Sequence, residues 1–278
     1  MPKILNIPEE TLKDLYLIQK LSSRKIAKTF NCAYSTIDRK IHLLGLPIRN
    51  LSQAHIIYER KNFSGHSEEK AYLIGFRIGD LRVRKFYKNS ETIIVDCGST
   101  KNEQIDLIKN LFSPYGHIWI SQPKHRNKRH IQCHLNESFS FLLNKNAPKN
   151  VFNNQSYFFS FLAGFTDAEG SIFISKSQNQ AHYSLGNYNL KLLQKIQSSL
   201  AKFNISSPKI AHSPRKGLLA SHGYRYNHDY WTLVISKKTE LINFFKLISP
   251  YLKHQNRIKQ MKTAINNIEE RNKLYGSK

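Results

Sequence analysis

Acidic residues, cysteines and long apolar runs are all scarce in this chain. Only 19 Asp and Glu residues stand against 43 Lys and Arg residues among 278, and the formal net charge is +24. Such an excess favours a polyanionic partner, with nucleic acid as the first candidate and an anionic membrane surface as the alternative. No apolar run approaches the roughly 20 residues that span a bilayer, and the N-terminus lacks the apolar core of a signal peptide. We therefore expect a cytoplasmic protein, or one of an organellar matrix, that is neither secreted nor bound to a membrane.

The three cysteines are far apart and odd in number: Cys32, Cys97 and Cys133. They form neither a disulfide framework nor a CxxC zinc site. Histidines near Cys133 are a weak suggestion of a metal site, and we interpret them instead as strand and loop residues that face solvent or phosphate.

Two short segments carry the same pattern of small residues. In each, small residues recur at every fourth position and an acidic residue follows the last of them: Ala71, Gly75, Gly79 and Asp80 in the first, and Ser160, Gly164, Ala168 and Glu169 in the second. Every fourth residue of an α-helix lies on one face, so each segment offers a stripe that another backbone can approach closely. We expect Gly75, Gly79, Gly164 and Ala168 to form the interface of a helix pair.

Packing of the two stripes would place Asp80 and Glu169 side by side at one end of the helix pair. An acidic residue at a helix C-terminus is unfavourable by about 0.3–1 kcal/mol, and two adjacent carboxylates repel unless a cation lies between them. Since both segments have an acidic residue at this unfavourable position, the pattern favours a divalent metal site with Asp80 and Glu169 as ligands. The alternative is a pair of ordinary core helices with chance acidic residues at their ends.

Residues 1–50 differ from the rest of the chain. The apolar spacing predicts helices over 7–18, 22–30 and 34–44, with a tight turn before the third. This arrangement resembles the helix-turn-helix domain of resolvases and many bacterial regulators, whose third helix enters the DNA major groove. The resemblance implies a DNA contact by the outward face of that helix, formed by Tyr34, Ser35, Thr36, Arg39 and Lys40. The alternative is a small three-helix module that binds a protein or nothing.

The rest of the chain repeats one order of elements. After each acid-ended helix the pattern predicts two strands, a helix, two strands and a closing helix, which is an α+β fold. We expect these domains and linkers: a helix-turn-helix domain over 1–50, a linker over 51–67, a first repeat over 68–147, an inter-repeat linker over 148–155, a second repeat over 156–260, and a basic C-terminal helix or tail over 261–278.

The chain resembles a single-chain, two-motif LAGLIDADG homing endonuclease with an added N-terminal helix-turn-helix. Residues 162–170 match the family motif at nearly every position, whereas residues 73–81 depart from it at Ile78 and Leu81. The resemblance implies two pseudo-symmetric αββαββα repeats whose antiparallel sheets form a saddle on DNA, in a monomer with internal pseudo-dimer symmetry. It also implies a structural role for Asp167, at the sixth place of the second motif.

The family resemblance also implies a chemistry. Asp80 and Glu169 would be the catalytic acids and would hold Mg²⁺, for which Mn²⁺ could substitute, because carboxylates are hard oxygen ligands. Lys145 and Lys253 are the nearest matches to the family's basic residue near the end of each repeat, although Gln255 could take the second place. The implied reaction is double-strand cleavage at a long, asymmetric DNA site. The alternatives are a catalytically silent DNA-binding regulator and a maturase that binds structured RNA.

Basic residues gather at matching places of the two repeats. Arg82 and Arg84 share one face of a strand, and two strand-joining loops carry further cations. Such residues hold phosphates, while interleaved polar side chains contact base edges. The predicted DNA-binding set of the repeats is Arg82, Arg84, Lys124, Arg126, Lys128, Arg129, Lys176, Arg215, Lys216 and Arg225.

Overall fold

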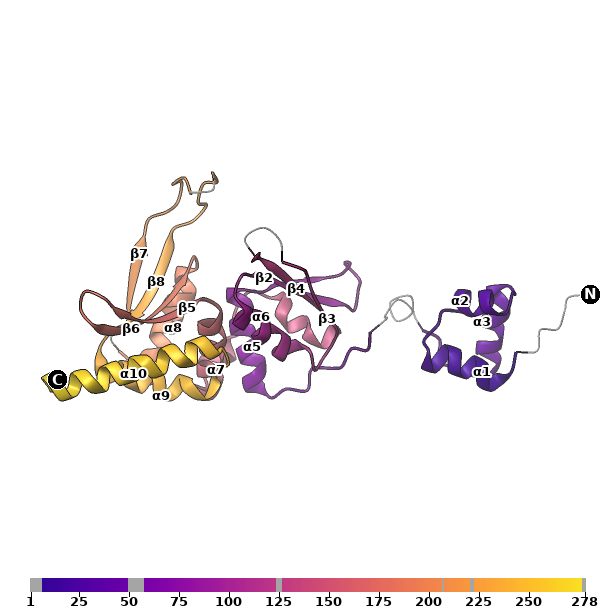
Figure 1. The fold of residues 1–278 in the computed structure, drawn as a ribbon, viewed down its shortest axis with the longest axis horizontal. Helices are drawn as coiled ribbons and strands as arrows, with labels where there is room; N and C mark the ends of the chain where they lie inside the picture. The colour runs from indigo at the N-terminus through magenta and orange to yellow at the C-terminus, as the bar shows by residue number, and fades with distance from the viewer. Residues whose placement is uncertain (1–6, 50–57, 124–126, 207, 221–222, 277–278) are drawn as a thin grey trace, which may run out of the picture. The chain divides into compact units, whose positions relative to one another are not determined.

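The structure, a computed structural model, describes residues 7–49, 58–123, 127–206, 208–220 and 223–276 (Figure 1). The chain divides into two compact units, Met1–Glu59 and Arg60–Lys278. Within the described residues, no helix is both long and apolar enough to cross a membrane.

The N-terminal unit contains three short helical segments around a core of its own. They are α1 (Glu9–Lys13) with the π-helical turn η1 (Asp14–Ile18), α2 (Ser23–Thr29) and α3 (Tyr34–Leu43). The side chain of Ser22 accepts a hydrogen bond from Lys25 N and caps α2, and Asn31 turns the chain toward α3 with a φ of 48°. The core consists of Ile7, Leu12, Tyr16, Ile26, Ala27, Ile37 and Ile41. The helices lie where the sequence predicts them, and the helix-turn-helix function stays a prediction.

The second unit contains the same succession of elements twice. The first copy comprises α5 (Ser67–Gly79), β1 (Arg82–Lys85), β2 (Ile93–Ser99), α6 (Asn102–Phe112), β3 (Ile118–Ile120), β4 (Arg129–Leu135) and the 3-10 helix η3 (Glu137–Leu143). The second comprises α7 (Gln155–Glu169), β5 (Gly170–Ser175), β6 (Gln180–Asn187), α8 (Leu190–Lys202), β7 (Lys209–Ser213), β8 (Tyr230–Ile235) and α9 (Lys238–Ile248). The 3-10 helix η4 (Lys149–Phe152) joins the copies, and η5 (Ser249–Tyr251) and α10 (Gln255–Tyr275) follow the second.

Each copy forms one four-stranded antiparallel sheet. The strand orders are β1-β2-β4-β3 and β5-β6-β8-β7, so the two sheets share one topology. In both sheets the second and fourth strands in chain order are the central pair, with Val95 opposite Cys133 in the first and Leu185 opposite Leu233 in the second. The predicted α+β class with two four-stranded sheets is confirmed.

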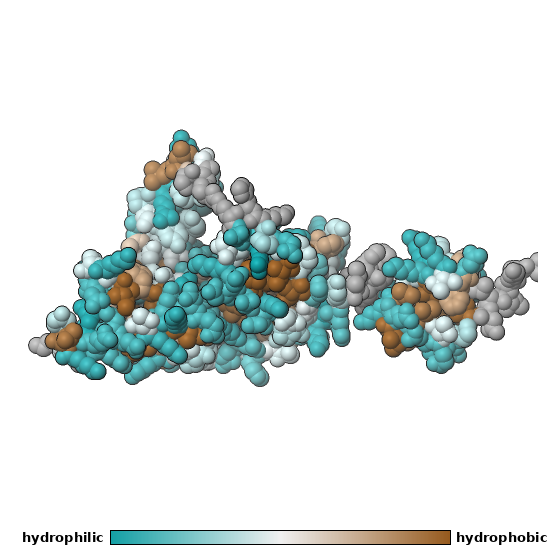
Figure 2. All heavy atoms as spheres, viewed as in Figure 1, coloured by the Kyte–Doolittle hydropathy of each residue, from teal (hydrophilic) through white to brown (hydrophobic). Residues whose placement is uncertain are grey.

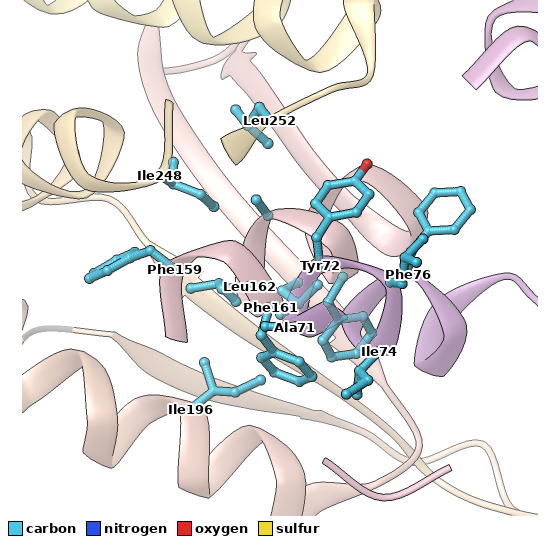
Figure 3. Packing of buried hydrophobic residues seen from close by; sticks show 14 of the residues in the cluster. Ala71, Tyr72, Ile74, Phe76, Phe159, Phe161, Leu162, Ile196, Ile248 and Leu252 are labelled. Carbon is cyan, nitrogen blue, oxygen red and sulfur yellow. The ribbon is translucent and has the colours of Figure 1, made fainter. Parts of the chain in front are cut away.

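The two sheets are joined through the helix pair α5–α7. An ideal Cβ on Gly75 would lie 1.9 Å from the carbonyl oxygen of Phe161, and one on Gly164 would lie 2.0 Å from that of Tyr72. The two backbones therefore touch where only glycine fits, and the contact is the same in both directions. Around it pack the rings of Tyr72, Phe76 and Phe161 with aliphatic side chains from α8, α9 and the segment before α10 (Figure 3).

Several boundaries differ from the sequence prediction. The second half of the predicted linker packs on the first repeat, because Phe63 contacts the rings of Tyr115 and Phe139 and its N–H donates to Ser138. The predicted inter-repeat linker contains η4, whose Phe152 is buried. The predicted end of the second repeat at residue 260 falls inside α10, which is continuous over Gln255–Tyr275.

Candidate active site

The acidic residues of the two motifs lie together at the ends of α5 and α7. Asp80 follows the last residue of α5, and Glu169 is the last residue of α7. An ideal Cβ on Gly79 would lie 2.4 Å from Ala168 Cβ and 3.0 Å from Glu169 Cγ, so the helices are in contact up to the acids. Burial, and then the charge of Glu169, raise the pKa of Asp80 to about 6. Burial also raises the pKa of Glu169.

The surroundings of the two carboxylates are unequal. Gln104, the third residue of α6, is buried and its Nε2 donates to Asp80 Oδ2 over 2.6 Å. The third residue of α8 in the second repeat is Leu192, which is buried and has no hydrogen-bonding side chain. One motif acid therefore has a fixed amide partner that the corresponding position of the other repeat does not supply.

The helix α10 brings a cation to both acids. The half-buried guanidinium of Arg257 lowers the pKa values of Asp80 and Glu169, so its charge acts on both carboxylates. Its Nη1 donates to Gln260 over 2.9 Å, while its Nε is buried without a hydrogen-bond partner. Arg257 is not among the residues predicted from the sequence. The helical spacing of apolar residues after residue 254 does indicate a helix at that place.

Asp167 ties the start of α10 to the helix pair. This residue is buried, and its Oδ2 accepts hydrogen bonds from Tyr72 Oη (2.7 Å), Lys253 N (2.8 Å) and His254 N (3.0 Å). Burial raises its pKa to about 6 against the opposing effect of these hydrogen bonds. The second motif thus holds the backbone immediately before α10, about one turn ahead of Arg257.

The side chains of the two predicted lysines lie elsewhere. Lys253 Nζ is 3.7 Å from Glu69 Oε1 and 4.9 Å from the centre of the Tyr72 ring, so it is directed along α5 and away from its C-terminal end. Lys145 is exposed in the segment after η3. Among the interactions of the described residues, none joins either ammonium group to Asp80 or Glu169.

Comparison with known proteins finds a family match in the second repeat. Residues 157–249 match the family described as a LAGLIDADG-like domain. The uncharacterized protein MJ0314 of Methanocaldococcus jannaschii is 30% identical over 180 residues, a match that covers 61% of this chain and 67% of that protein. The second repeat of the chain is therefore a LAGLIDADG-like domain.

Solved LAGLIDADG structures resemble the chain at low sequence identity. I-DmoI in complex with DNA and Ca is 19% identical with a TM-score of 0.46, covering 71% of this chain and 98% of that one. The homing endonuclease I-WcaI bound to its DNA recognition sequence is 16% identical with a TM-score of 0.49, covering 81% and 97%. The N-terminal LAGLIDADG domain of DUF199/WhiA is 19% identical with a TM-score of 0.44, covering 70% and 88%.

The candidate metal ligands at this site are two carboxylates, those of Asp80 and Glu169. No group of three or more His, Cys, Asp and Glu side chains suited to a metal occurs in the described part of the chain. Burial raises the pKa values of Cys97 and Cys133 to about 12, which keeps both thiols protonated. A metal at the LAGLIDADG motifs would therefore depend on oxygen ligands from a substrate and from water.

The predicted DNA-binding residues of the repeats lie on the sheets and their hairpins. Arg82 and Arg84 are exposed on β1, with Arg84 Nε 3.9 Å from Asp96 Oδ2. Lys128 lies over Gly98, where an ideal Cβ would be 2.6 Å from its Cε. Lys124 and Arg126 lie outside the described residues. The others are Arg129 at the start of β4, Lys176 after β5, and Arg215, Lys216 and Arg225 between β7 and β8.

In the N-terminal unit, the predicted contact face of α3 is mostly exposed. Tyr34, Ser35 and Arg39 face solvent, and Thr36 is half-buried. The ammonium of Lys40 donates to the carbonyl of Ile7 over 2.8 Å and so holds the chain before α1.

Proposed function

We propose that this protein is a Mg²⁺-dependent, site-specific endonuclease that cuts both strands of double-stranded DNA and acts as a monomer. One observation carries the proposal: the glycine contact between α5 and α7 brings Asp80 and Glu169 together at one end of the helix pair. Two acids at equivalent positions of the α5–α7 pair suit a substrate with two equivalent strands. The charge of +24 suits a polyanion.

The two carboxylates fit a divalent cation. Their oxygens are the hard ligands that Mg²⁺ prefers, and Mg²⁺ is usually held by one or two protein carboxylates together with substrate phosphates and water. The charge of Glu169 raises the pKa of Asp80, a repulsion that a bound cation would relieve. Bound Mg²⁺ would supply charge neutralisation at the scissile phosphate and a more acidic water. Mn²⁺, with which one structure of I-DmoI in complex with DNA was solved, would substitute for Mg²⁺.

The residues around the acids each have a defined task in this proposal. Gln104 orients the carboxylate of Asp80 by its 2.6 Å hydrogen bond. Arg257 adds a fixed positive charge where negative charge develops on the phosphate during hydrolysis, and it takes the role that the family resemblance implies for Lys145 and Lys253. Asp167 positions Arg257 through the backbone of Lys253 and His254.

The basic residues of the sheets would hold the duplex over this site. Arg82, Arg84 and Lys128 belong to the first repeat, and Arg215, Lys216 and Arg225 to the second. Their contacts to phosphates would fix the register of the DNA, while neighbouring polar side chains read base edges. The outward face of α3, with Tyr34 and Arg39, would extend the contact as a helix-turn-helix.

The test is Mg²⁺-dependent cleavage of host genomic DNA and of a randomised duplex library, with Ca²⁺ as the control for binding. Wild type is compared with Glu169→Gln, which removes one ligand charge, and with Glu270→Gln, an exposed acid in α10, as the matched control. We expect discrete double-strand breaks at one long site for wild type and Glu270→Gln, and none for Glu169→Gln. Tight duplex binding without breaks in Mg²⁺ or Mn²⁺ would replace this proposal with a regulator or, if structured RNA binds more tightly, a maturase.

A further inference from the structure

The segment between β7 and β8 exposes an apolar tip. Figure 1 shows the chain continuing past β7 and β8 as a projecting loop, and Figure 2 shows hydrophobic side chains near the end of this loop. Leu218, Leu219 and Tyr224 are 57%, 65% and 55% exposed. Removing such side chains from water is favourable, so their exposure at a projecting tip points to a partner surface.

The tip is held by a regular small hairpin. Leu219 and Arg225 are paired across it, and backbone hydrogen bonds join Tyr226 N to Leu218 O and Ala220 N to Tyr224 O. At its base, Asp229 Oδ1 accepts the N–H groups of Arg215 and Lys216, each over 2.9 Å. The leucines are therefore presented on a formed β-ribbon.

A row of four tyrosine rings, with one guanidinium between the second and the third, runs from the sheet along the hairpin. The ring centres of Tyr188 and Tyr230 are 5.1 Å apart, and the Arg215 guanidinium lies 4.7 Å from Tyr230 and 5.8 Å from Tyr226. Tyr226 in turn lies 5.5 Å from Tyr224 at the tip. Burial raises the pKa of Tyr230, and the negative charge of Glu169 raises it further. This row connects the region of the active site with the tip.

The charges of the hairpin indicate an anionic partner. Arg215, Lys216 and Arg225 flank the apolar tip, whereas Asp229 is the one acidic residue between β7 and β8 in the sequence. That carboxylate is already engaged with two backbone N–H groups and with His212 at 3.2 Å. An apolar tip between cations fits a surface with both phosphates and apolar groups, and the DNA major groove has thymine methyl groups between its phosphate rows.

We propose that Leu218 and Leu219 read thymine at one end of the target through contact with its 5-methyl group. This inference rests on the proposed DNA-cutting function and deepens it by naming a specificity-determining pair. The major groove admits a two-stranded β-ribbon, and apolar contact with the thymine methyl is one of its direct readouts. Arg215, Lys216 and Arg225 hold the flanking phosphates.

The first repeat has no corresponding pair of leucines. Its corresponding segment between β3 and β4, residues 121–128, is Ser-Gln-Pro-Lys-His-Arg-Asn-Lys and contains no leucine, phenylalanine, tyrosine or tryptophan. The methyl readout therefore belongs to the half of the target bound by the second repeat, and the other half lacks it. This difference gives the pseudo-symmetric protein a way to set its orientation on an asymmetric site.

The experiment uses the full chain in Ca²⁺ and a randomised duplex library synthesised with thymine. The selected duplex is then remade with uracil, which lacks the 5-methyl group, at one thymine at a time. We expect uracil to weaken wild-type binding about fourfold per contacted methyl, at one or two positions near one end only. The double variant Leu218→Ser, Leu219→Ser should bind the thymine duplex more weakly and be insensitive to uracil at those positions. Leu274→Ser, which changes an exposed leucine near the end of α10, should behave as wild type.

Two results would overturn the inference. If wild type selects and binds a duplex but tolerates uracil at every position, the methyl readout is wrong while the proposed DNA function stands. If the chain binds no duplex, and instead binds anionic phospholipid vesicles through the same leucines, both the inference and the proposed function fail.

Discussion

The carbonyl oxygen of Tyr72 lies against the α-carbon of Gly164, so that an ideal Cβ at residue 164 would be 2.0 Å from it. The reverse contact, between Gly75 and the carbonyl of Phe161, has nearly the same dimensions. These contacts determine how close α5 and α7 come, and hence whether the acids at their ends meet. The geometry of the candidate site thus depends on residues without side chains.

Gly164→Ala should therefore destabilise the protein, although alanine is the better helix former by about 1 kcal/mol. The added methyl group meets backbone atoms that cannot rotate away, and overpacking of this kind costs about 1–3 kcal/mol or more. Gly98→Ala is the matched control, since its Cβ would meet the flexible end of Lys128. Urea denaturation of both variants checks this: equal midpoints would show that the helix pair can separate without penalty.

Arg257→Gln should reduce DNA cleavage and leave duplex binding nearly unchanged. The guanidinium acts electrostatically on both Asp80 and Glu169, and loss of one group that stabilises developing charge lowers a rate by about a hundredfold or more. Arg257→Lys, which keeps the charge, should retain part of the activity. Lys259→Gln, an exposed cation on the same helix, should cut at the wild-type rate in single-turnover assays. Wild-type cleavage by Arg257→Gln would remove this residue from the site.

Gln104→Leu should slow the cutting of one strand more than the other. The substitution gives α6 the same residue type that α8 has at Leu192, and it leaves Asp80 without its 2.6 Å hydrogen bond. If each of the two acids serves one of the two DNA strands, a supercoiled plasmid bearing the target should accumulate as nicked circle before it is linearised. Direct conversion to linear DNA, with both strands slowed equally, would argue against separate roles for the two acids.

Asp167 should contribute a pH dependence to stability. Burial raises its pKa to about 6 in the folded protein, whereas an unfolded aspartate has a pKa of about 3.9. Between these values the folded state binds the proton more readily, so the free energy of unfolding gains a contribution as the pH falls from about 6 to about 4. In Asp167→Asn that contribution should be absent. Denaturation curves at several pH values test this, and parallel pH profiles for the two proteins would contradict it.

Much of the central architecture could be predicted from the sequence because it depends on local periodicity. Small residues at every fourth position form a stripe on one face of a helix, and two such stripes predict the contact of Gly75 and Gly164. The alternation of apolar residues after each acid likewise predicts the strands of both sheets. These features need no knowledge of distant residues.

The cation at the site could not be predicted in the same way. The position of Arg257 depends on hydrogen bonds from Lys253 N and His254 N to Asp167, a residue far away in the sequence. The direction of Lys253 depends on Glu69, which is also distant along the chain. A spacing rule locates a residue on a helix but does not determine which long-range partner orients its side chain.

Removal of residues 1–59 should leave a folded nuclease with weaker DNA binding. The N-terminal unit has its own core around Leu12 and Ile37, separate from the core of the second unit. The remaining chain therefore keeps that second core, including the α5–α7 pair, together with Arg257. For every phosphate that the truncated protein no longer binds, the slope of log K against log salt should fall by about 0.9. Arg39→Ala, at an exposed position of α3, should reproduce part of that change in the full chain. An unchanged slope for the truncated protein would show that the N-terminal unit does not bind DNA.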